Sequence, residues 1–204
     1  MATAQETSEP RQLTEQGRQR KQQIVEAAMA LFAERGYSAT RISDICESAG
    51  VAKGLFYWYF PTKLDLFSEL VRTMRQQLRR AQARAADADA DPLTRIRQGA
   101  EASVRFMAEH SNYFELLDVE RSDPAIASVL RSGSSVYRDD VTALVIEAQS
   151  AGLIVDANPH LMAVGVLGAV AAFDSARRSS KIDVSTDELA ATVGEWVAKA
   201  LRAP

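Results

Sequence analysis

Cysteine and histidine are almost absent from this chain of 204 residues, which has one cysteine, Cys46, and two histidines, His110 and His160. A single thiol excludes an intrachain disulfide framework and fits a reducing compartment. The two histidines lie 50 positions apart, in separate predicted helices. The sequence also lacks a cysteine cluster and the HExxH, P-loop, GxSxG and dinucleotide-binding glycine motifs. We therefore expect no catalytic residues, no metal-binding residues and no cofactor.

Long apolar runs and a signal sequence are also missing. The longest apolar run, 161–173, has 13 residues, whereas a membrane-spanning helix needs about 20. The first ten residues, MATAQETSEP, are polar and contain no apolar signal core. The sequence thus predicts a cytoplasmic protein with no membrane partner, in which 161–173 is a buried or interface helix.

Glycine and proline are few, at 10 and 6 residues, and the alternation of apolar and polar residues that marks strands is missing. With 47% hydrophobic residues, this composition favours an all-α protein with a sizeable core. Apolar residues that recur every three to four positions, with capping residues at the ends, predict nine helices. They span 16–35, 42–49, 53–59, 63–85, 92–109, 112–121, 123–150, 159–179 and 186–202.

The net charge of −3 argues against a uniformly basic nucleic-acid binder but not against a local basic face. Between Arg18 and Lys63 there are seven lysines and arginines and four acids, so this part carries a charge of +3. The acidic excess lies elsewhere in the chain. Binding to a polyanion, if it occurs, is expected in the N-terminal third.

The segment 42–60, ISDICESAGVAKGLFYWYF, has the pattern of two short helices joined by a tight turn. Gly50 is the expected turn residue, because glycine adopts a positive φ at little cost. The second helix, 53–59, carries Lys53 and large aromatic residues. This is the helix-turn-helix pattern, whose second helix enters the DNA major groove. One face of the first helix consists of Ile42, Ile45, Cys46 and Ala49, with Cys46 expected as a small buried hydrophobe.

A set of spaced residues in and around this segment carries a family resemblance. They are Gly36, Tyr37, Thr40, Ile42 and Ile45, then Ala49 to Gly54, Tyr57, Tyr59, Phe60 and Lys63. Together they resemble the N-terminal DNA-binding domain of the TetR family of bacterial repressors, over about 16–70. The resemblance implies a nine-helix fold with a flexible arm (1–15), a DNA-binding domain (16–62) and a ligand-binding and dimerisation domain (63–204). It also implies a homodimer on a palindromic operator, released by a small effector.

Nine residues are candidates for contact with double-stranded DNA. Lys53 at the start of the second helix is placed to reach guanine acceptors or a phosphate, and Gly54 allows the backbone to approach closely. Thr40, Ser43, Tyr59 and Lys63 match family positions that touch DNA. Arg41 replaces a common small hydroxyl and adds a phosphate contact, whereas Leu55 replaces a frequent hydroxyl residue. The candidates are Thr40, Arg41, Ser43, Lys53, Gly54, Tyr57, Trp58, Tyr59 and Lys63.

An alternative is that all the aromatic rings of 56–60 belong to the core. Five adjacent large rings cannot all face inward on one short helix. We therefore assign Phe56 and Phe60, four positions apart, to the core, and expect Tyr57 and Trp58 to face outward.

The candidate effector site is an apolar pocket in the C-terminal domain, rich in Met and Phe. An ordinary helix-bundle core explains each of these residues equally well. The candidates are Phe67, Met74, Phe106, Met107, Phe114, Leu117, Tyr137 and Phe173, with His110, Asp118, Glu120 and Arg138 as polar groups able to orient a ligand. A hydrophobic or amphipathic small molecule is the expected effector.

The last two predicted helices are the candidate dimer surface, because small residues permit close helix approach. Packing within one chain would use the same residues. The candidates are Gly165, Gly168, Ala172, Val193 and Trp196.

Two other classes of function compete with DNA binding. An enzyme with an acidic metal site would use Asp118, Glu120 and Asp123, although such spacing usually marks a solvated helix face. An interaction protein that does not bind DNA would use the same helical bundle. The sequence favours a ligand-responsive repressor over both.

Overall fold

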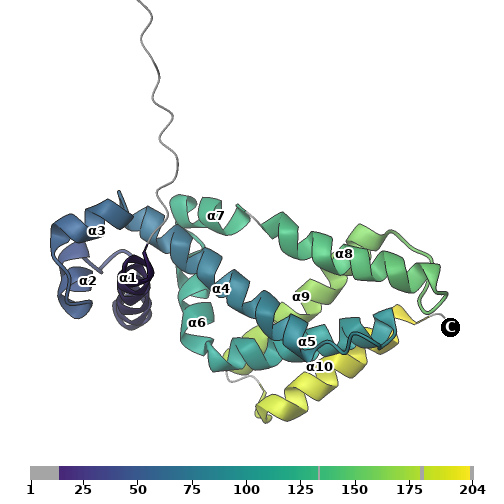
Figure 1. Cartoon of the computed structure of the whole chain (residues 1–204). Helices are drawn as coiled ribbons and strands as arrows, with labels where there is room; N and C mark the ends of the chain where they lie inside the picture. The colour runs from purple at the N-terminus through teal and green to yellow at the C-terminus, as the bar shows by residue number, and fades with distance from the viewer. Residues whose placement is uncertain (1–13, 133, 180–181, 203–204) are drawn as a thin grey trace, which may run out of the picture. The chain divides into compact units, whose positions relative to one another are not determined.

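The computed structural model describes residues 14–132, 134–179 and 182–202, and within these ranges the chain is helical (Figure 1). An isolated antiparallel bridge joins Ile154 and Arg202. The all-α prediction is therefore confirmed. The ten helices are α1 (Glu15–Arg35), α2 (Ile42–Ser48), α3 (Lys53–Tyr59), α4 (Lys63–Ala85), α5 (Pro92–Glu109), α6 (Ser111–Glu120), α7 (Pro124–Arg131), α8 (Ser134–Ser150), α9 (Pro159–Arg178) and α10 (Thr186–Leu201).

The predicted helix 123–150 is two helices, α7 and α8. Ser132 has an extended backbone, with φ −62° and ψ 126°, which stops α7. The guanidinium of Arg75 on α4 donates hydrogen bonds to the carbonyls of Leu130 and Ser132. These bonds satisfy carbonyls that a helix end leaves without partners. The small, flexible residues of this stretch are poor helix formers, so tertiary contacts decide its conformation.

The described chain divides into two compact units, one up to Phe67 and one from Ser68 onward. The division falls inside α4, whereas the sequence placed its domain boundary at the start of this helix. α4 begins at Lys63, as the sequence predicted. Just before it, the hydroxyl of Thr62 accepts from the Asp65 N–H at 3.1 Å, and the Asp65 carboxylate accepts from the Thr62 N–H at 3.0 Å. This reciprocal pair is a capping box. Most of the predicted arm, 1–13, lies outside the described residues.

The core of the first unit forms where α1, α2, α3 and the first turn of α4 meet. Phe32 is fully buried, and its ring centroid lies 5.3 Å from that of Tyr37 and 6.1 Å from that of Phe67. α1 ends at Gly36, whose φ of 81° is open to glycine at little cost. The other buried apolar residues of this unit are Ile24, Val25, Ala28, Leu31, Ile45, Cys46, Phe56, Phe60 and Leu66.

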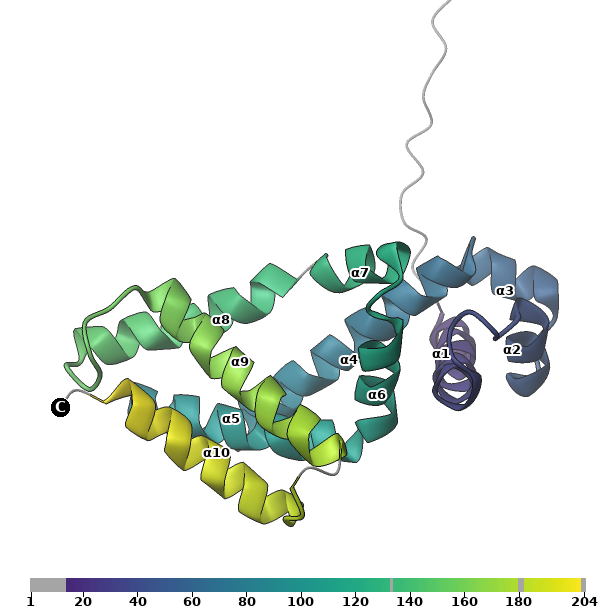
Figure 2. The same cartoon turned by 180° about the vertical axis from the view of Figure 1, so that it is seen from behind.

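The core of the second unit centres on α5, against which α10 packs closely. A Cβ atom placed on Gly194 would lie 2.6 Å from Cγ of Glu101, so only glycine fits this crossing without a shift. In Figure 2, α9 runs in front of α5 and α4. Buried apolar residues from several helices meet between them, among them Ile96, Val104, Val145, Val170, Val193 and Val197.

Candidate nucleic-acid interface and internal cavity

The helix-turn-helix of the sequence prediction is present as α2, a turn and α3. Gly50 has a φ of 63°, as expected for the turn residue. The Val51 N–H donates to the Cys46 carbonyl at 2.9 Å, which closes the end of α2. Cys46 is buried, as predicted, and burial raises the pKa of its thiol while the charge of Lys53 opposes that shift. The turn thus fixes where α3 begins.

The α3 helix divides its aromatic residues between the two sides, as predicted. Phe56 and Phe60 are 0% and 3% exposed, with ring centroids 5.9 Å apart. Tyr57 and Trp58 are 52% and 55% exposed. Because α3 has only seven residues, the buried rings fix its rotation about its own axis. The opposite side therefore presents a fixed set of side chains to solvent.

The other exposed groups of this face come from the N-terminal ends of α3 and α2. Lys53 and Gly54 lie exposed at the start of α3, and no atom lies within 4 Å of a Cβ placed on Gly54. Arg41 is exposed at the start of α2, where its N–H donates to the Asp44 carboxylate at 3.3 Å. The half-buried Ser43 donates its hydroxyl to the same carboxylate at 3.2 Å.

Thr40 does not present its side chain to solvent, and the structure contradicts a DNA contact from its hydroxyl. It is 1% exposed, and its hydroxyl donates to the carbonyls of Gly36, at 2.8 Å, and Leu31, at 3.3 Å. A buried hydroxyl must be hydrogen-bonded, and here the acceptors are carbonyls at the end of α1. Thr40 therefore ties the α1–α2 loop to α1.

Tyr59 and Lys63 donate side-chain hydrogen bonds to backbone carbonyls within the first unit. The Tyr59 hydroxyl donates to the Gly17 carbonyl at 2.9 Å. The Lys63 ammonium donates to the carbonyls of Tyr37, at 2.7 Å, and Thr40, at 2.8 Å, and lies 4.4 Å from the centroid of the Tyr37 ring. Both side chains are half-buried. Both therefore hold the unit together, which the family resemblance did not indicate.

The second unit contains a cavity of about 760 Å³ between α4, α5, α6 and the helices that follow. Its wall is mainly apolar. Five of the eight predicted effector contacts line it: Met74, Phe106, Met107, Phe114 and Leu117. Sequence reasoning missed further lining residues that are unremarkable in a helical stripe, notably Val71, Leu78, Gln82, Ser103 and Tyr113.

Two predicted effector contacts are wrong, and one is not described. Phe67 is 0% exposed and packs on Tyr37 and Phe32, in the core of the first unit. Phe173 is not among the lining residues, and its ring packs on Trp196 with centroids 6.0 Å apart. Both lie on apolar stripes, and a stripe does not show which element it faces. The side chain of Tyr137 lies outside the described part of the structure.

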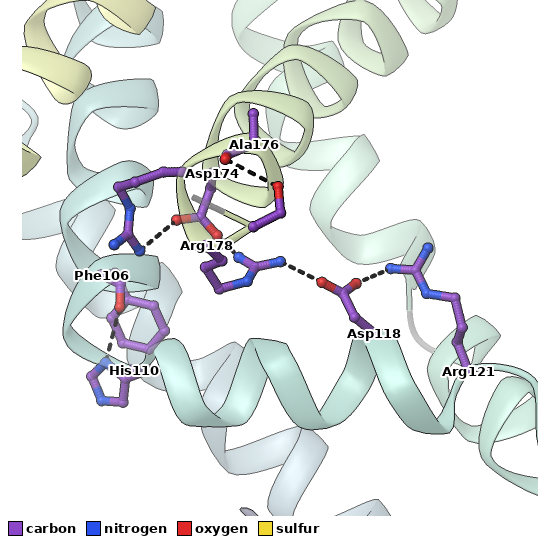
Figure 3. Close-up of polar contacts among 9 residues, drawn as sticks. Phe106, His110, Asp118, Arg121, Asp174, Ala176 and Arg178 are labelled. Atoms are coloured by element: carbon purple, nitrogen blue, oxygen red, sulfur yellow. Dashed lines mark hydrogen bonds and ion pairs between the residues drawn. The ribbon is translucent and has the colours of Figure 1, made fainter. Parts of the chain in front are cut away.

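Two of the polar groups proposed near the effector, His110 and Asp118, have partners within the subunit (Figure 3). His110 stacks on Phe106, with ring centroids 4.1 Å apart, and its Nδ1 lies 3.0 Å from the Phe106 carbonyl. Asp118 pairs with Arg121 and, at 2.7 Å, with Arg178. Glu120 also has interactions, and Arg138 is exposed. Asp118 is therefore part of a link between α6 and α9.

The same link reaches a buried carboxylate on α9. Asp174 is 0% exposed and forms ion pairs with Arg178 and, at 3.1 Å, with Arg177. Arg178 also lies over the ring of Phe114, 5.7 Å from its centroid. Among the described residues no group of three or more His, Cys, Asp or Glu is arranged to hold a metal ion. Of the acidic residues considered for a metal site, Asp118 forms ion pairs, and Asp123 accepts hydrogen bonds from the N–H groups of Ala125 and Ile126 at the start of α7.

The α9 helix leaves much of its apolar surface uncovered. Leu161 and Val164 are 70% and 49% exposed, and Gly165, Gly168 and Ala172 are exposed too. By length and composition α9 is the one described helix that could cross a membrane, a test that core helices of soluble proteins also pass. Only 22% of the apolar 18-residue stretch of α9 is buried.

The α10 helix contributes one of its two predicted dimer residues to the surface. Trp196 is 50% exposed, whereas Val193 is 0% exposed. Val193 lies on the stripe of α10 that faces the core of the second unit. The prediction for Val193 is therefore wrong, because the apolar stripe of α10 that contains it packs within the subunit.

The short, outward-facing α3 and its turn define a helix-turn-helix protein. The family model for bacterial regulatory proteins of the tetR family matches residues 24–70. The regulator AcrR of Shigella flexneri is 38% identical over 60 residues, covering 29% of this chain and 28% of its own. The repressor KstR2 of Mycobacterium tuberculosis is 34% identical over 91 residues, covering 45% and 46%. The chain therefore spans less than half the length of these curated relatives.

Longer matches extend over the second unit. The activator FasR of Mycolicibacterium smegmatis is 26% identical over 178 residues, covering 86% of this chain and 79% of its own. A solved TetR-family regulator of Rhodococcus sp. covers 91% of this chain and 100% of its own, with a TM-score of 0.79 and 19% identity. The regulator PfmR of Thermus thermophilus covers 86% and 97%, with a TM-score of 0.68 and 21% identity. Over residues 24–70 the chain thus matches the tetR family of bacterial regulatory proteins, and as a whole it shares the fold of solved TetR-family regulators.

Proposed function

We propose that this protein is a cytoplasmic repressor that binds a palindromic DNA operator as a homodimer and is released by a small apolar or amphipathic effector. The observation that carries this proposal is the division of α3 into two sides. Phe56 and Phe60 are buried, while Lys53, Gly54, Tyr57 and Trp58 face solvent. A seven-residue helix that exposes a lysine and two large aromatic residues is better suited to lie in the DNA major groove than to remain exposed to solvent.

The chemistry of this surface suits DNA. Lys53 offers an ammonium to guanine acceptors or a phosphate, and Gly54 keeps the backbone free of a side chain where the groove would approach. Tyr57 and Trp58 combine an apolar ring, which suits thymine methyl groups, with a polar donor that suits phosphate. Arg41 and Ser43, at the start of α2, add groups suited to phosphate. The buried Thr40 hydroxyl is not part of this surface. Tyr59 and Lys63 are secondary DNA contacts, because their polar groups also bind carbonyls of the same unit.

The effector proposal rests on the cavity of the second unit. A volume of about 760 Å³ with mainly apolar walls is within the range of small-molecule sites. Residues of α4 from Val71 to Ala83 line this cavity, and the same helix begins at Lys63 in the first unit. A ligand that fits only one arrangement of α4 shifts the population toward that arrangement. We therefore propose α4 as the element that transmits effector binding.

The homodimer proposal rests on the uncovered apolar surface of α9. Exposed leucine and valine side chains next to exposed glycines form a surface onto which a helix can pack closely. A second copy of α9, together with Trp196 of α10, would cover it symmetrically. A dimer of this kind would present two α3 helices about 34 Å apart, one turn of DNA, so its operator would be a palindrome.

Replacing Gly168 with arginine tests the dimer. No atom of the subunit lies within 4 Å of a Cβ placed there, so we expect the Gly168→Arg subunit to fold and to elute as a monomer. Light scattering after size exclusion measures the mass, and far-UV circular dichroism checks the fold. Glu109→Arg, at an exposed position of α5, is the control and should remain dimeric. A wild-type protein that is monomeric at micromolar concentration would rule out the dimer.

Footprinting on the DNA that flanks the protein's own gene tests the regulator as a whole. We expect protection of a palindrome of two half-sites one helical turn apart. A reporter driven by the protected promoter distinguishes repression from activation, which matters because the relatives include a named repressor and a named activator. Absence of any protected sequence, with a folded dimer, would favour the interaction protein over the regulator.

A further inference from the structure

The hydroxyl of Tyr113 is a polar group inside an apolar wall. Tyr113 lies on α6, is 4% exposed and lines the cavity. Within the described residues its hydroxyl has no hydrogen-bond partner, and it is not among the polar atoms sealed off from solvent. It therefore opens on the cavity. A buried tyrosine hydroxyl usually finds a partner, so this one is available to a ligand.

Arg75 brings a positive charge to the same cavity. Its guanidinium donates to the Leu130 carbonyl at 2.5 Å and to the Ser132 carbonyl, which holds it in a fixed position beside α7. Burial raises the pKa of Tyr113 far above neutral, and the charge of Arg75 opposes that shift only in part. Tyr113 is therefore a hydrogen-bond donor at neutral pH, in the field of a fixed cation.

The rest of the cavity wall is mainly apolar, with the charged side chains of Arg95, Arg121, Arg131 and Asp140 also among its lining residues. Along α4 the wall runs from Arg75 through Leu78 to Ala83, and Ala86 lines it just beyond the end of the helix. The eight residue steps from Arg75 to Ala83 cover about 12 Å at 1.5 Å per residue. The polar pair in this wall is internally satisfied: the Gln82 amide donates to the Ser103 hydroxyl at 2.9 Å, and that hydroxyl donates to the Gly99 carbonyl at 2.7 Å. The shape suits an extended chain with a polar group at one end.

We propose that Tyr113 and Arg75 form the head-group subsite for a monocarboxylate with a long unbranched apolar chain. The carboxylate accepts a hydrogen bond from the Tyr113 hydroxyl in the field of Arg75, and the chain lies along α4 toward Ala86. This deepens, and rests on, the proposed effector-responsive function. A cationic head group cannot accept the hydrogen bond and is repelled by Arg75, whereas a neutral alcohol accepts it without the charge attraction.

Titration calorimetry of the full chain with three probes of equal chain length tests the head group. The probes are dodecanoate and dodecyltrimethylammonium, each below its critical micelle concentration, and dodecan-1-ol below its solubility limit. We expect dodecanoate to bind at least about tenfold more tightly than dodecan-1-ol, because a hydrogen bond to a charged group is the stronger one. Dodecyltrimethylammonium should bind most weakly. Equal affinity for the three probes, or no binding of dodecanoate, would overturn the proposal.

Tyr113→Phe removes the hydroxyl and keeps the ring. We expect its affinity for dodecanoate to fall at least about tenfold and its affinity for dodecan-1-ol to fall about threefold, since a neutral hydrogen bond is weaker. The ligand-free variant should unfold at the same temperature as the wild type or higher, because among the described residues the hydroxyl has no hydrogen-bond partner to lose. A purely structural role for the hydroxyl would lower that temperature and leave the ratio of the two affinities unchanged, and that result would contradict the subsite.

Arg79→Gln is the matched control for Arg75→Gln. Arg79 lies one turn further along α4, is half exposed, pairs with Asp140 and does not line this cavity. Arg79→Gln should leave dodecanoate affinity within about twofold, and Arg75→Gln should weaken it about tenfold. Because calorimetry needs no DNA, this result is independent of operator binding. If the protein binds dodecanoate tightly but protects no operator, the regulator proposal is contradicted and the subsite is supported. If it binds an operator but does not bind dodecanoate, the subsite is contradicted and the regulator proposal is supported.

Discussion

Reversing the charge at Lys53 should weaken operator binding at least about a hundredfold without loss of fold. Lys53 lies exposed in the first turn of α3. A lysine that contacts a base edge or a phosphate contributes about 1–3 kcal/mol, and a glutamate in its place adds repulsion from the phosphates. A hundredfold change corresponds to about 2.8 kcal/mol. Fluorescence anisotropy with the footprinted operator gives the affinity, and circular dichroism and thermal unfolding check the fold.

The salt dependence of the same measurement separates the two roles of Lys53. If Lys53 contacts a phosphate, Lys53→Met should lower the slope of log K against log salt by about 1, whereas a base contact should relax sequence preference instead. Lys199→Glu is the matched control, because Lys199 is exposed on α10 and pairs only with the exposed Glu195 among the described residues. If Lys53→Glu and Lys199→Glu weaken binding equally, α3 is not the reading helix.

Replacing Asp174 with asparagine should destabilise the protein by about 3–5 kcal/mol, the cost of leaving a buried charge without its partner. Asp174 is fully buried between Arg177 and Arg178, whose side chains are 20% and 7% exposed. Asparagine keeps the shape but leaves both guanidinium groups without this carboxylate. For a chain of this size we expect the unfolding temperature to fall by roughly 6–20 °C. Differential scanning calorimetry measures this shift.

The control is an ion pair of the same kind on the surface. Asp187 is 86% exposed and pairs with Arg105 at 3.1 Å, so Asp187→Asn should change stability by less than about 1 kcal/mol. Because Arg178 also contacts Asp118 and the ring of Phe114, the loss of Asp174 should loosen α6 as well. An unfolding temperature for Asp174→Asn equal to that of Asp187→Asn would show that the link between α6 and α9 carries no stability.

Local chemistry decided the elements that sequence patterns predicted correctly. The φ of Gly50, the capping box of Thr62 and Asp65, and the inward Phe56 and Phe60 all depend on residues within a few positions of one another. Helix periodicity and turn residues act over the same short range. For this reason the all-α class, the helix-turn-helix and the outward face of α3 were all available from the amino-acid sequence.

Only the tertiary structure decided which helix each apolar stripe faces. Phe67 and Val193 lie on regular stripes, yet one packs beside Phe32 and the other lies in the core beneath α10. A contact between distant segments also marks the end of α7, where the Arg75 guanidinium donates to the Ser132 carbonyl. The sequence by itself determined an all-helical protein with a helix-turn-helix, because these signals are local. The cavity and the open hydroxyl of Tyr113 depend on how helices far apart in the chain pack, and no local pattern records that.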